Sequence, residues 1–302
     1  MNIAFICGSP RSGTTILSEI LDRHPQIQEW YEPYYIWAYH FDIRSNDIWI
    51  DDDLTDKALR SIRREFKIFT EKSGARLVLD KSPGHALNIK IISKIFPTAK
   101  WIHAYRDGRD VTLSIKKEWE TRKQMVASRD LSRLYKISWT MLKRQPYWRY
   151  RLKAILFEIK NHMSLNPKTY LNKSKWRGKP YWGPRFEGWE RYLSDHSPLE
   201  FNAMQWVKLV EAVRRDWDTL PEENKIEIKY EDLLRSTKHT LTALFRTLGL
   251  QPANDFYDNL PKLKEKNYGK WRHGFAEGEI HKIRPILTPM LCELGYENCL
   301  DW

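Results

Sequence analysis

The chain has 302 residues, of which 41% are hydrophobic and 30% charged, a composition that excludes a disordered or fibrous protein. Its formal net charge of +12 at pH 7 favours anionic partners such as nucleotides, acidic glycans, nucleic acid or anionic lipid surfaces. Three cysteines are too few and too scattered for a disulfide framework or a zinc site, and no stretch approaches the roughly 20 apolar residues of a membrane span.

Strands and helices are expected to alternate in the first part of the chain. The apolar run at 2–8 predicts a buried strand with Cys7 as a core thiol, and 14–24 predicts a helix that stops at Pro25. Further strands are expected at 75–81 and 99–106, followed by helices at 86–96 and from 108 onward. This order predicts an α/β fold, a parallel sheet flanked by helices that binds ligands at the carboxyl ends of its strands.

The segment from about 120 to 200 has a different composition. From Met141 to Glu190 there are 12 Lys and Arg against 3 Asp and Glu, interleaved with ten aromatic residues. We interpret 120–200 as a basic, aromatic cap inserted on the acceptor side of a single domain that spans 1–302. Its aromatic residues suit either a glycan acceptor or the core beneath a solvated lid, and the sequence leaves both open.

The last hundred residues predict three helices and a strand. The strand is expected at 224–230, and the helices at 202–217, 238–249 and 284–296. The first of these helices is amphipathic, and its expected buried residues are Met204, Val207, Leu209, Val210 and Val213.

The loop after the first strand has the form of a phosphate-binding loop. It reads GSPRSGTT, with Gly8 and Gly13 at the spacing that lets backbone N–H groups and a helix N-terminus surround a phosphate. Thr14 stands where a nucleoside triphosphatase has lysine, and Arg11 supplies a cation earlier in the loop. This favours a nucleotide with one 5′-phosphate that carries a transferable group, without an obligatory metal. The candidate binding residues are Arg11, Ser12, Gly13, Thr14 and Thr15.

A second phosphate site is predicted in the stretch YRDGRDVTLS. Arg106 ends a strand and Ser114 follows about two turns into the next helix, so the pair can bind a separate phosphate through a guanidinium fork and a hydroxyl. The alternative is a salt-bridge cluster of Arg106 with Asp107, Arg109 and Asp110.

Together the two stretches resemble the superfamily of sulfotransferases that use 3′-phosphoadenosine-5′-phosphosulfate (PAPS), and their spacing is nearest to the tyrosylprotein and carbohydrate branch. SPRSGTT is similar to the family's 5′-phosphosulfate loop, and YRDGRDVTLS to its 3′-phosphate motif. The resemblance implies PAPS as the nucleotide cosubstrate and no metal. It also accounts for the missing lysine, because PAPS has no β- or γ-phosphate.

The resemblance implies roles for further residues. Glu32 lies 21 residues after Arg11, a spacing similar to that of the catalytic glutamate in tyrosylprotein sulfotransferases. In DKSPGHA, Lys81 is implied beside the transferred sulfuryl group, and His85 is the second candidate for the base. Tyr230 in IKYEDLL is implied to contact the nucleotide.

The matching segments cover about 2–118 and 202–298. In GKWRHGF, Lys270 is implied to close over the cosubstrate, and its neighbour Trp271 is grouped with it.

The acceptor is expected to be a glycan hydroxyl. Peptide-sulfating members carry arginines after the glutamate, whereas this chain has EPYYIWAYHF, whose aromatic residues Tyr34, Tyr35, Trp37 and Tyr39 suit sugar rings or a phenol. A tyrosine or small phenolic acceptor is the alternative within the family.

Two other classes of protein remain as alternatives. A P-loop kinase or NTPase is disfavoured by the missing lysine and by Asp80 as the sole acidic candidate for a metal ligand at a strand end. A basic nucleic-acid-binding protein would leave both phosphate motifs unexplained. No secretory segment precedes the first strand, so a cytoplasmic location is expected, with a membrane-peripheral location or a targeting segment removed from the chain as the alternatives.

Overall fold

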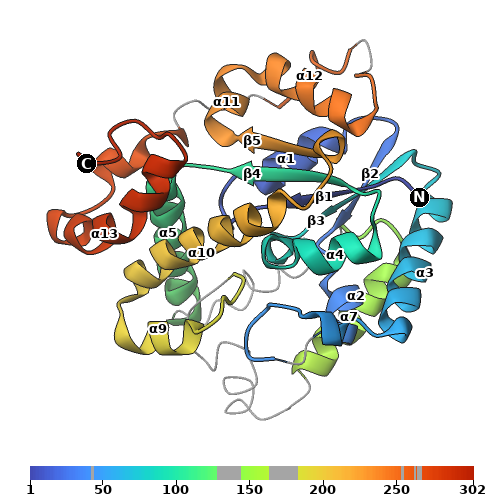
Figure 1. The fold of residues 1–302 in the computed structure, drawn as a ribbon, viewed down its shortest axis with the longest axis horizontal. Coiled ribbons are helices and arrows are strands. Elements are labelled where there is room, and N and C mark those ends of the chain that lie inside the picture. Colours follow the sequence, from blue (N-terminus) through green and yellow to red (C-terminus); the bar gives the residue numbers. More distant parts are fainter. Residues whose placement is uncertain (42–43, 128–143, 163–182, 253–254, 262, 264–266) are drawn as a thin grey trace.

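A single parallel sheet of five strands forms the centre of the computed structural model, which describes residues 1–41, 44–127, 144–162, 183–252, 255–261, 263 and 267–302 (Figure 1). The strand order is β2-β3-β1-β4-β5, and every neighbouring pair is parallel. The strands are β1 (Ile3–Cys7), β2 (Ile27–Tyr31), β3 (Leu77–Lys81), β4 (Lys100–Tyr105) and β5 (Lys225–Lys229). The predicted α/β fold is confirmed.

The described α-helices surround this sheet. They are α1 (Thr14–Leu21), α2 (Tyr34–Phe41), α3 (Asp56–Ser73), α4 (Ile89–Ile95), α5 (Gly108–Ala127), α7 (Trp148–His162), α9 (Trp189–Asp195), α10 (Pro198–Trp217), α11 (Tyr230–Arg235), α12 (Thr237–Leu248) and α13 (Glu277–Glu293). Short 3-10 helices occupy Asp51–Asp53, Pro83–Leu87, Glu222–Asn224 and Lys270–His273.

Alternation along the strands sends side chains to two separate cores. Phe5 of β1 faces a core shared with α3, α4 and α10, whereas Ile6 faces a core shared with α1 and α12. Both faces of each central strand are therefore covered, which explains why these strands read as continuous apolar runs.

The predicted helices lie where they were expected, and α1 and α5 begin at the expected residues, whereas others begin elsewhere. α10 begins four residues before its expected start, at a capping box in which the Ser197 side chain accepts a hydrogen bond from the Glu200 backbone N–H. The expected buried residues Val207, Leu209, Val210 and Val213 are buried, and Met204 is partly exposed. α13 begins at Glu277 rather than at 284.

Outside the expected cap, one strand and three α-helices were not expected: β2, α2, α3 and α11. α3 had a sequence signal, because Thr55 caps its first turn, Gly74 ends it, and Ala58, Ile62, Phe66 and Phe69 form its buried stripe. β2 had little signal, because the five residues IQEWY do not alternate cleanly.

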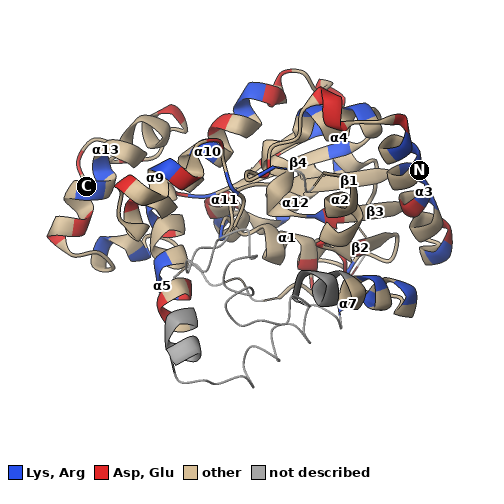
Figure 2. Ribbon diagram, turned by 90° about the horizontal axis from the view of Figure 1, so that it is seen from below, with Lys and Arg blue, Asp and Glu red and all other residues tan. Residues whose placement is uncertain are grey.

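The expected cap is only partly described. α7 and α9 belong to it, and Figure 2 shows Lys and Arg residues along α7. Tyr150 of α7 packs on Trp30 with ring centroids 4.8 Å apart. Residues 128–143 and 163–182 lie outside the described residues, so the cap stays a prediction.

Two of the three cysteines form a single disulfide, which the sequence did not predict. Cys292 and Cys299 form a disulfide, because α13 ends and the chain turns back so that their Cα atoms come within 5.3 Å. Cys7 is free and buried, as expected. Disulfides are rare in a reducing cytosol, so this one argues against the expected cytoplasmic location. Among the helices described, none is long and apolar enough to cross a membrane.

Candidate functional site

The predicted site residues gather at one edge of the sheet. Because all five strands are parallel, their carboxyl ends meet there. Each strand end contributes one of these residues or the phosphate loop. The loop from Gly8 follows β1, Glu32 follows β2, Lys81 ends β3, Arg106 follows β4 and Tyr230 follows β5.

The phosphate loop requires its two glycines. A Cβ on Gly8 would lie 2.1 Å from the Ala104 carbonyl oxygen of β4, and one on Gly13 would lie 2.3 Å from the Tyr230 ring. Both glycines also have a positive φ, 148° and 89°. The loop is therefore confined between β4 and the first residue of α11, and its helix, α1, begins at Thr14.

The two predicted phosphate motifs meet although they are far apart in the sequence. Arg11 Nε donates a hydrogen bond to Ser114 Oγ at 2.9 Å, and Arg106 Nη1 donates one to the Arg11 carbonyl oxygen at 3.3 Å. One cluster of guanidinium and hydroxyl groups thus joins the loop after β1 to the first two turns of α5.

Arg106 is held from several sides. It lies over the Tyr230 ring at 4.7 Å, Trp206 Nε1 donates to its carbonyl oxygen at 3.2 Å, and its Nη2 donates to the Asn267 carbonyl oxygen. The Asp110 carboxylate lies 3.6 Å from Nη2. Burial raises the pKa of Asp110, and the positive charge of Arg106 opposes that rise.

Three buried polar atoms near this cluster have no partner in the described structure. They are Ser12 Oγ, Arg106 Nε and Trp271 Nε1. Buried polar groups are nearly always hydrogen-bonded, so orphaned donors of this kind fit a site for an anionic nucleotide. Ser12 and Arg106 come from the two predicted phosphate motifs, which makes the fit specific.

Lys270 and Trp271 are attached to the same cluster. Lys270 is exposed and donates to Asn267 Oδ1 at 2.7 Å, and Trp271 is buried with its backbone N–H donating to Asp110 Oδ1 at 3.0 Å. The predicted contact of both residues with the nucleotide is compatible with these positions.

Glu32 and Lys81 form an ion pair at the ends of neighbouring strands. The Lys81 side chain is 2% exposed and its ammonium lies 4.5 Å from the Tyr31 ring centroid, while the Glu32 side chain is 13% exposed. Glu32 has a φ of 40°, an uncommon conformation for a residue with a side chain. The pair is therefore largely buried, with Glu32 the more exposed of the two side chains, and the ion pair fixes their orientation.

His85 lies in the core. Its Nε2 is 3.0 Å from Asp80 Oδ1, an ion-pair distance without hydrogen-bond geometry, and its ring is edge-on to Phe5 and Trp37. Asp80 also accepts hydrogen bonds from Trp37 Nε1 and Ser82 Oγ. The surroundings of both residues favour a structural role, which leaves Glu32 as the better placed candidate for the base.

The expected aromatic wall is smaller than the sequence indicated. Tyr35 and Trp37 are buried, and only Tyr34 and Tyr39, at 40% and 71%, are exposed. Arg144 was not predicted as a residue of this region, and it lies 3.9 Å from the Tyr31 ring centroid and forms ion pairs with Glu19 and Glu29. One arginine within a long basic segment gave no signal for this position.

No group of three His, Cys, Asp or Glu side chains that could hold a metal occurs within the described ranges. The charged groups of the candidate site are the arginines and lysines named above and the carboxylates of Glu32 and Asp110.

Comparison with known proteins identifies similar chains. A family model described as the sulfotransferase family matches residues 4–162. Protein-tyrosine sulfotransferase 1 of Danio rerio is 31% identical over 143 residues, which are 44% of this chain and 39% of that protein. The Homo sapiens protein of the same name is 30% identical over 143 residues, with 44% and 37% covered. The matched region is thus well under half the length of these curated relatives.

Two solved structures share the fold. The sulfotransferase domain from the curacin biosynthetic pathway has a TM-score of 0.55 and 16% identity, with 98% of both chains covered. Sulfotransferase STF9 from Mycobacterium avium has a TM-score of 0.50 and 14% identity, with 98% of this chain and 77% of that chain covered.

Proposed function

The chain belongs to the sulfotransferase family, and we propose that it transfers a sulfuryl group from PAPS to an acceptor hydroxyl. The observation that carries the proposal is the contact between the two phosphate motifs. Arg11 and Ser114 are 103 residues apart and hydrogen-bonded, and the buried Nε of Arg106 lacks a partner beside them.

The proposed binding roles follow from these contacts. Loop N–H groups and the start of α1 bind the 5′-phosphosulfate end, and the glycines allow close approach of the backbone. Arg106 and Ser114 bind the 3′-phosphate, with Arg11 linking the two subsites. Guanidinium groups suit this task because they offer charge and paired N–H donors together.

The proposed chemistry is an in-line displacement in which the sulfuryl group moves from the phosphate of PAPS to the acceptor oxygen. Glu32 accepts the proton of the acceptor hydroxyl. Lys81 stabilises the negative charge that develops on the transferred group and holds Glu32 through their ion pair. Neither role requires a metal.

For the acceptor we propose a phenolic hydroxyl, such as that of tyrosine. The similarity to the protein-tyrosine sulfotransferases supports a phenolic acceptor over the glycan acceptor that was expected from the sequence. A glycan hydroxyl is the second candidate, supported by the exposed rings of Tyr34 and Tyr39 and by the basic, aromatic segment that follows α5.

Isothermal calorimetry tests the donor. The purified protein is titrated with adenosine 3′,5′-bisphosphate in EDTA, with ATP and Mg²⁺ as the comparator. Binding of the bisphosphate alone, at about micromolar affinity or tighter, is the expected result. Binding of ATP and Mg²⁺ alone would contradict the proposal and favour the kinase alternative.

The acceptor is tested with labelled PAPS against tyrosine-containing peptides, small phenols and glycans in parallel. Transfer to a phenol with none to glycans is expected. Transfer to glycans alone would support the proposed sulfotransferase activity but show that the acceptor is a glycan rather than a phenol.

A further inference from the structure

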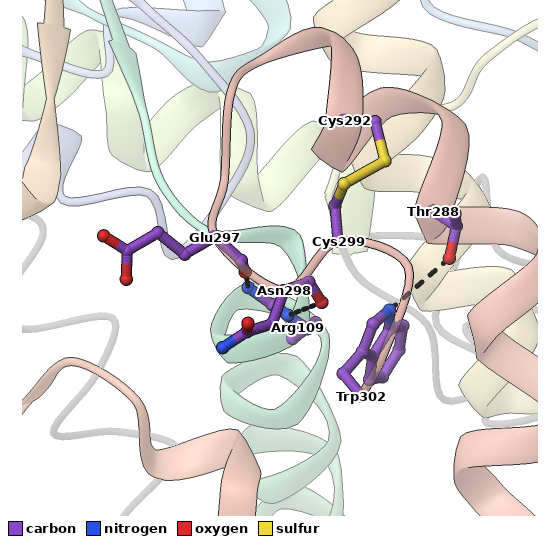
Figure 3. The surroundings of a disulfide bond; sticks show 7 residues. All are labelled: Arg109, Thr288, Cys292, Glu297, Asn298, Cys299 and Trp302. Carbon is purple, nitrogen blue, oxygen red and sulfur yellow. Dashed lines mark hydrogen bonds between the residues drawn. A yellow bond between two sulfur atoms is a disulfide. The ribbon is translucent and has the colours of Figure 1, made fainter.

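The C-terminal segment after α13 forms a loop closed by the Cys292–Cys299 disulfide. Figure 3 shows this loop lying against the start of α5, where Arg109 points into it. The loop follows α13 in the chain and contacts the start of α5. The turn just before α5 carries Arg106, because α5 begins two residues after it.

Arg109 is buried, with 1% of its surface exposed. Its guanidinium contacts the disulfide loop, Asp107 and Trp271. Its Nη1 donates to the Asn298 carbonyl oxygen and its Nη2 to the Glu297 carbonyl oxygen, both at 3.2 Å. It also forms a forked pair with Asp107, at 2.9 Å from Nε and 2.8 Å from Nη2, and lies over the Trp271 ring at 4.1 Å.

These contacts hold the turn that carries Arg106. Asp107 follows Arg106 directly and is fixed by Arg109 on its carboxylate and by Glu231 Oε1, which accepts from its backbone N–H at 3.1 Å. Tyr296 from the disulfide loop donates to the other oxygen of Glu231 at 3.2 Å. The loop therefore supports the turn through both Arg109 and Glu231.

The acceptors of Arg109 need the loop to keep its shape. Glu297 and Asn298 are exposed, lie in no helix or strand, and Asn298 has a φ of 53°. The disulfide fixes the loop's end, Cys299, to α13, whose buried face packs against α10. Without the disulfide, the two carbonyl groups that accept hydrogen bonds from Arg109 lie on a loop whose end is no longer tied to α13.

We propose that Arg109 is a positioning residue for the 3′-phosphate subsite, and that the Cys292–Cys299 disulfide keeps it in place. This inference rests on the proposed function. It adds that an intact disulfide is required for full affinity toward nucleotides with a 3′-phosphate, while the 5′ subsite on the loop after β1 is unaffected.

The test compares two nucleotides that differ only in the 3′-phosphate: adenosine 3′,5′-bisphosphate and adenosine 5′-monophosphate. Calorimetry is run on the full chain, oxidised and after reduction by dithiothreitol, and on the Cys292→Ser/Cys299→Ser variant. Reduction transfers two electrons and two protons from the dithiol, which becomes a cyclic disulfide, and yields two cysteine thiols. We expect the bisphosphate to bind roughly tenfold more weakly after reduction and in the variant, with the monophosphate unchanged.

Two point variants separate Arg109 from the general charge of the region. Arg109→Lys keeps the charge but loses the fork, so the same selective loss is expected. Arg272→Lys is the matched control, because Arg272 also lies over the Trp271 ring, at 4.9 Å, but is exposed and has no contact with the loop carbonyls among the described residues. Its bisphosphate affinity is expected to stay at the wild-type level.

Several results would overturn the inference. They are free thiols at Cys292 and Cys299 in the oxidised protein by mass spectrometry, unchanged bisphosphate affinity after verified reduction, or equal loss of both nucleotides. Dithiothreitol should not affect the serine variant, and an effect there would locate the sensitivity elsewhere. If the oxidised wild type fails to bind the bisphosphate at all, the proposed function falls first, and this inference with it.

Discussion

Backbone conformation and the predicted chemistry coincide at two single residues. Arg11 and Glu32 have φ values of 68° and 40°, and the third residue other than glycine with positive φ among those described is Asn298, beside Arg109. Such conformations are costly for residues with a side chain and persist where surrounding contacts fix them. Here those contacts direct a guanidinium at Ser114 and a carboxylate at Lys81.

Glu32→Gln tests the assignment of the base. The amide keeps the shape of the side chain but cannot accept the acceptor's proton, so kcat should fall on the order of 10²–10⁴-fold. Affinity for adenosine 3′,5′-bisphosphate should hold, because Glu32 is assigned no role in nucleotide binding. Steady-state kinetics with calorimetry would check both, and near-normal turnover would return the role to His85.

Gly13→Ala tests the confined phosphate loop. The new methyl group would meet the Tyr230 ring, so about 1–3 kcal/mol of overpacking strain is expected, together with weaker binding of adenosine 3′,5′-bisphosphate. Gly74→Ala is the matched control, because Gly74 has a φ of 63° but nothing within 4 Å of the added Cβ. Urea unfolding and calorimetry on both variants give the comparison. Equal effects of the two substitutions would mean that Tyr230 does not confine the loop.

At the scale of elements, the β4–β5 pair carries a buried histidine next to a carboxylate. His103 Nδ1 lies 2.8 Å from Glu227 Oε1, and this hydrogen bond lowers the pKa of Glu227 below its ordinary 4.5. The unfolded chain therefore binds a proton at a higher pH than the folded chain. The contribution of this pair to stability is present above pH 4.5 and is lost as the pH falls through the lowered pKa.

Glu227→Gln should accordingly flatten the acid side of the stability profile. The wild type is expected to lose more unfolding free energy than the variant between about pH 5 and pH 3. Urea melts across that range provide the measurement, with Glu223→Gln as the control, because Glu223 is exposed. Parallel profiles of wild type and Glu227→Gln would show that the pair is not linked to folding.

Elements with a strong period were predictable from the sequence. The apolar runs of β1, β3 and β4 and the phosphate motifs that follow them gave the fold class and most of the candidate site, because parallel strands bring their carboxyl ends together. β2 and α2 were missed although Glu32 lies between them, since short edge strands and helices rich in buried aromatics lack a clear period. The contacts of Arg109 and Arg144 depend on tertiary packing, which no local pattern encodes.

At the scale of the whole molecule, the net charge of +12 fits either a nucleic-acid-binding surface or a site for a small nucleotide. The two differ in how strongly their affinity depends on salt concentration. In Figure 2 acidic and basic residues are interspersed along α3 and α13, so the described helices there do not present a surface of one sign. A protein that binds nucleic acid through many exposed phosphate contacts releases counterions and loses affinity steeply with salt. The proposed nucleotide site instead uses buried groups, among them Ser12 at 1% and Arg106 at 8% exposure.

Affinity for adenosine 3′,5′-bisphosphate should therefore fall less than tenfold between about 50 and 200 mM salt, because buried charges are screened weakly. A nucleic-acid site with six to ten phosphate contacts would lose about 10³–10⁵-fold over the same range. Calorimetry with the bisphosphate and fluorescence anisotropy with a mixed-sequence RNA, at matched salt concentrations, would measure both slopes. A shallow slope for the bisphosphate with weak, steeply salt-dependent RNA binding agrees with a sulfotransferase whose basic surface is incidental to the donor. Tight RNA binding that the bisphosphate cannot displace would instead show that the positive charge serves a nucleic acid.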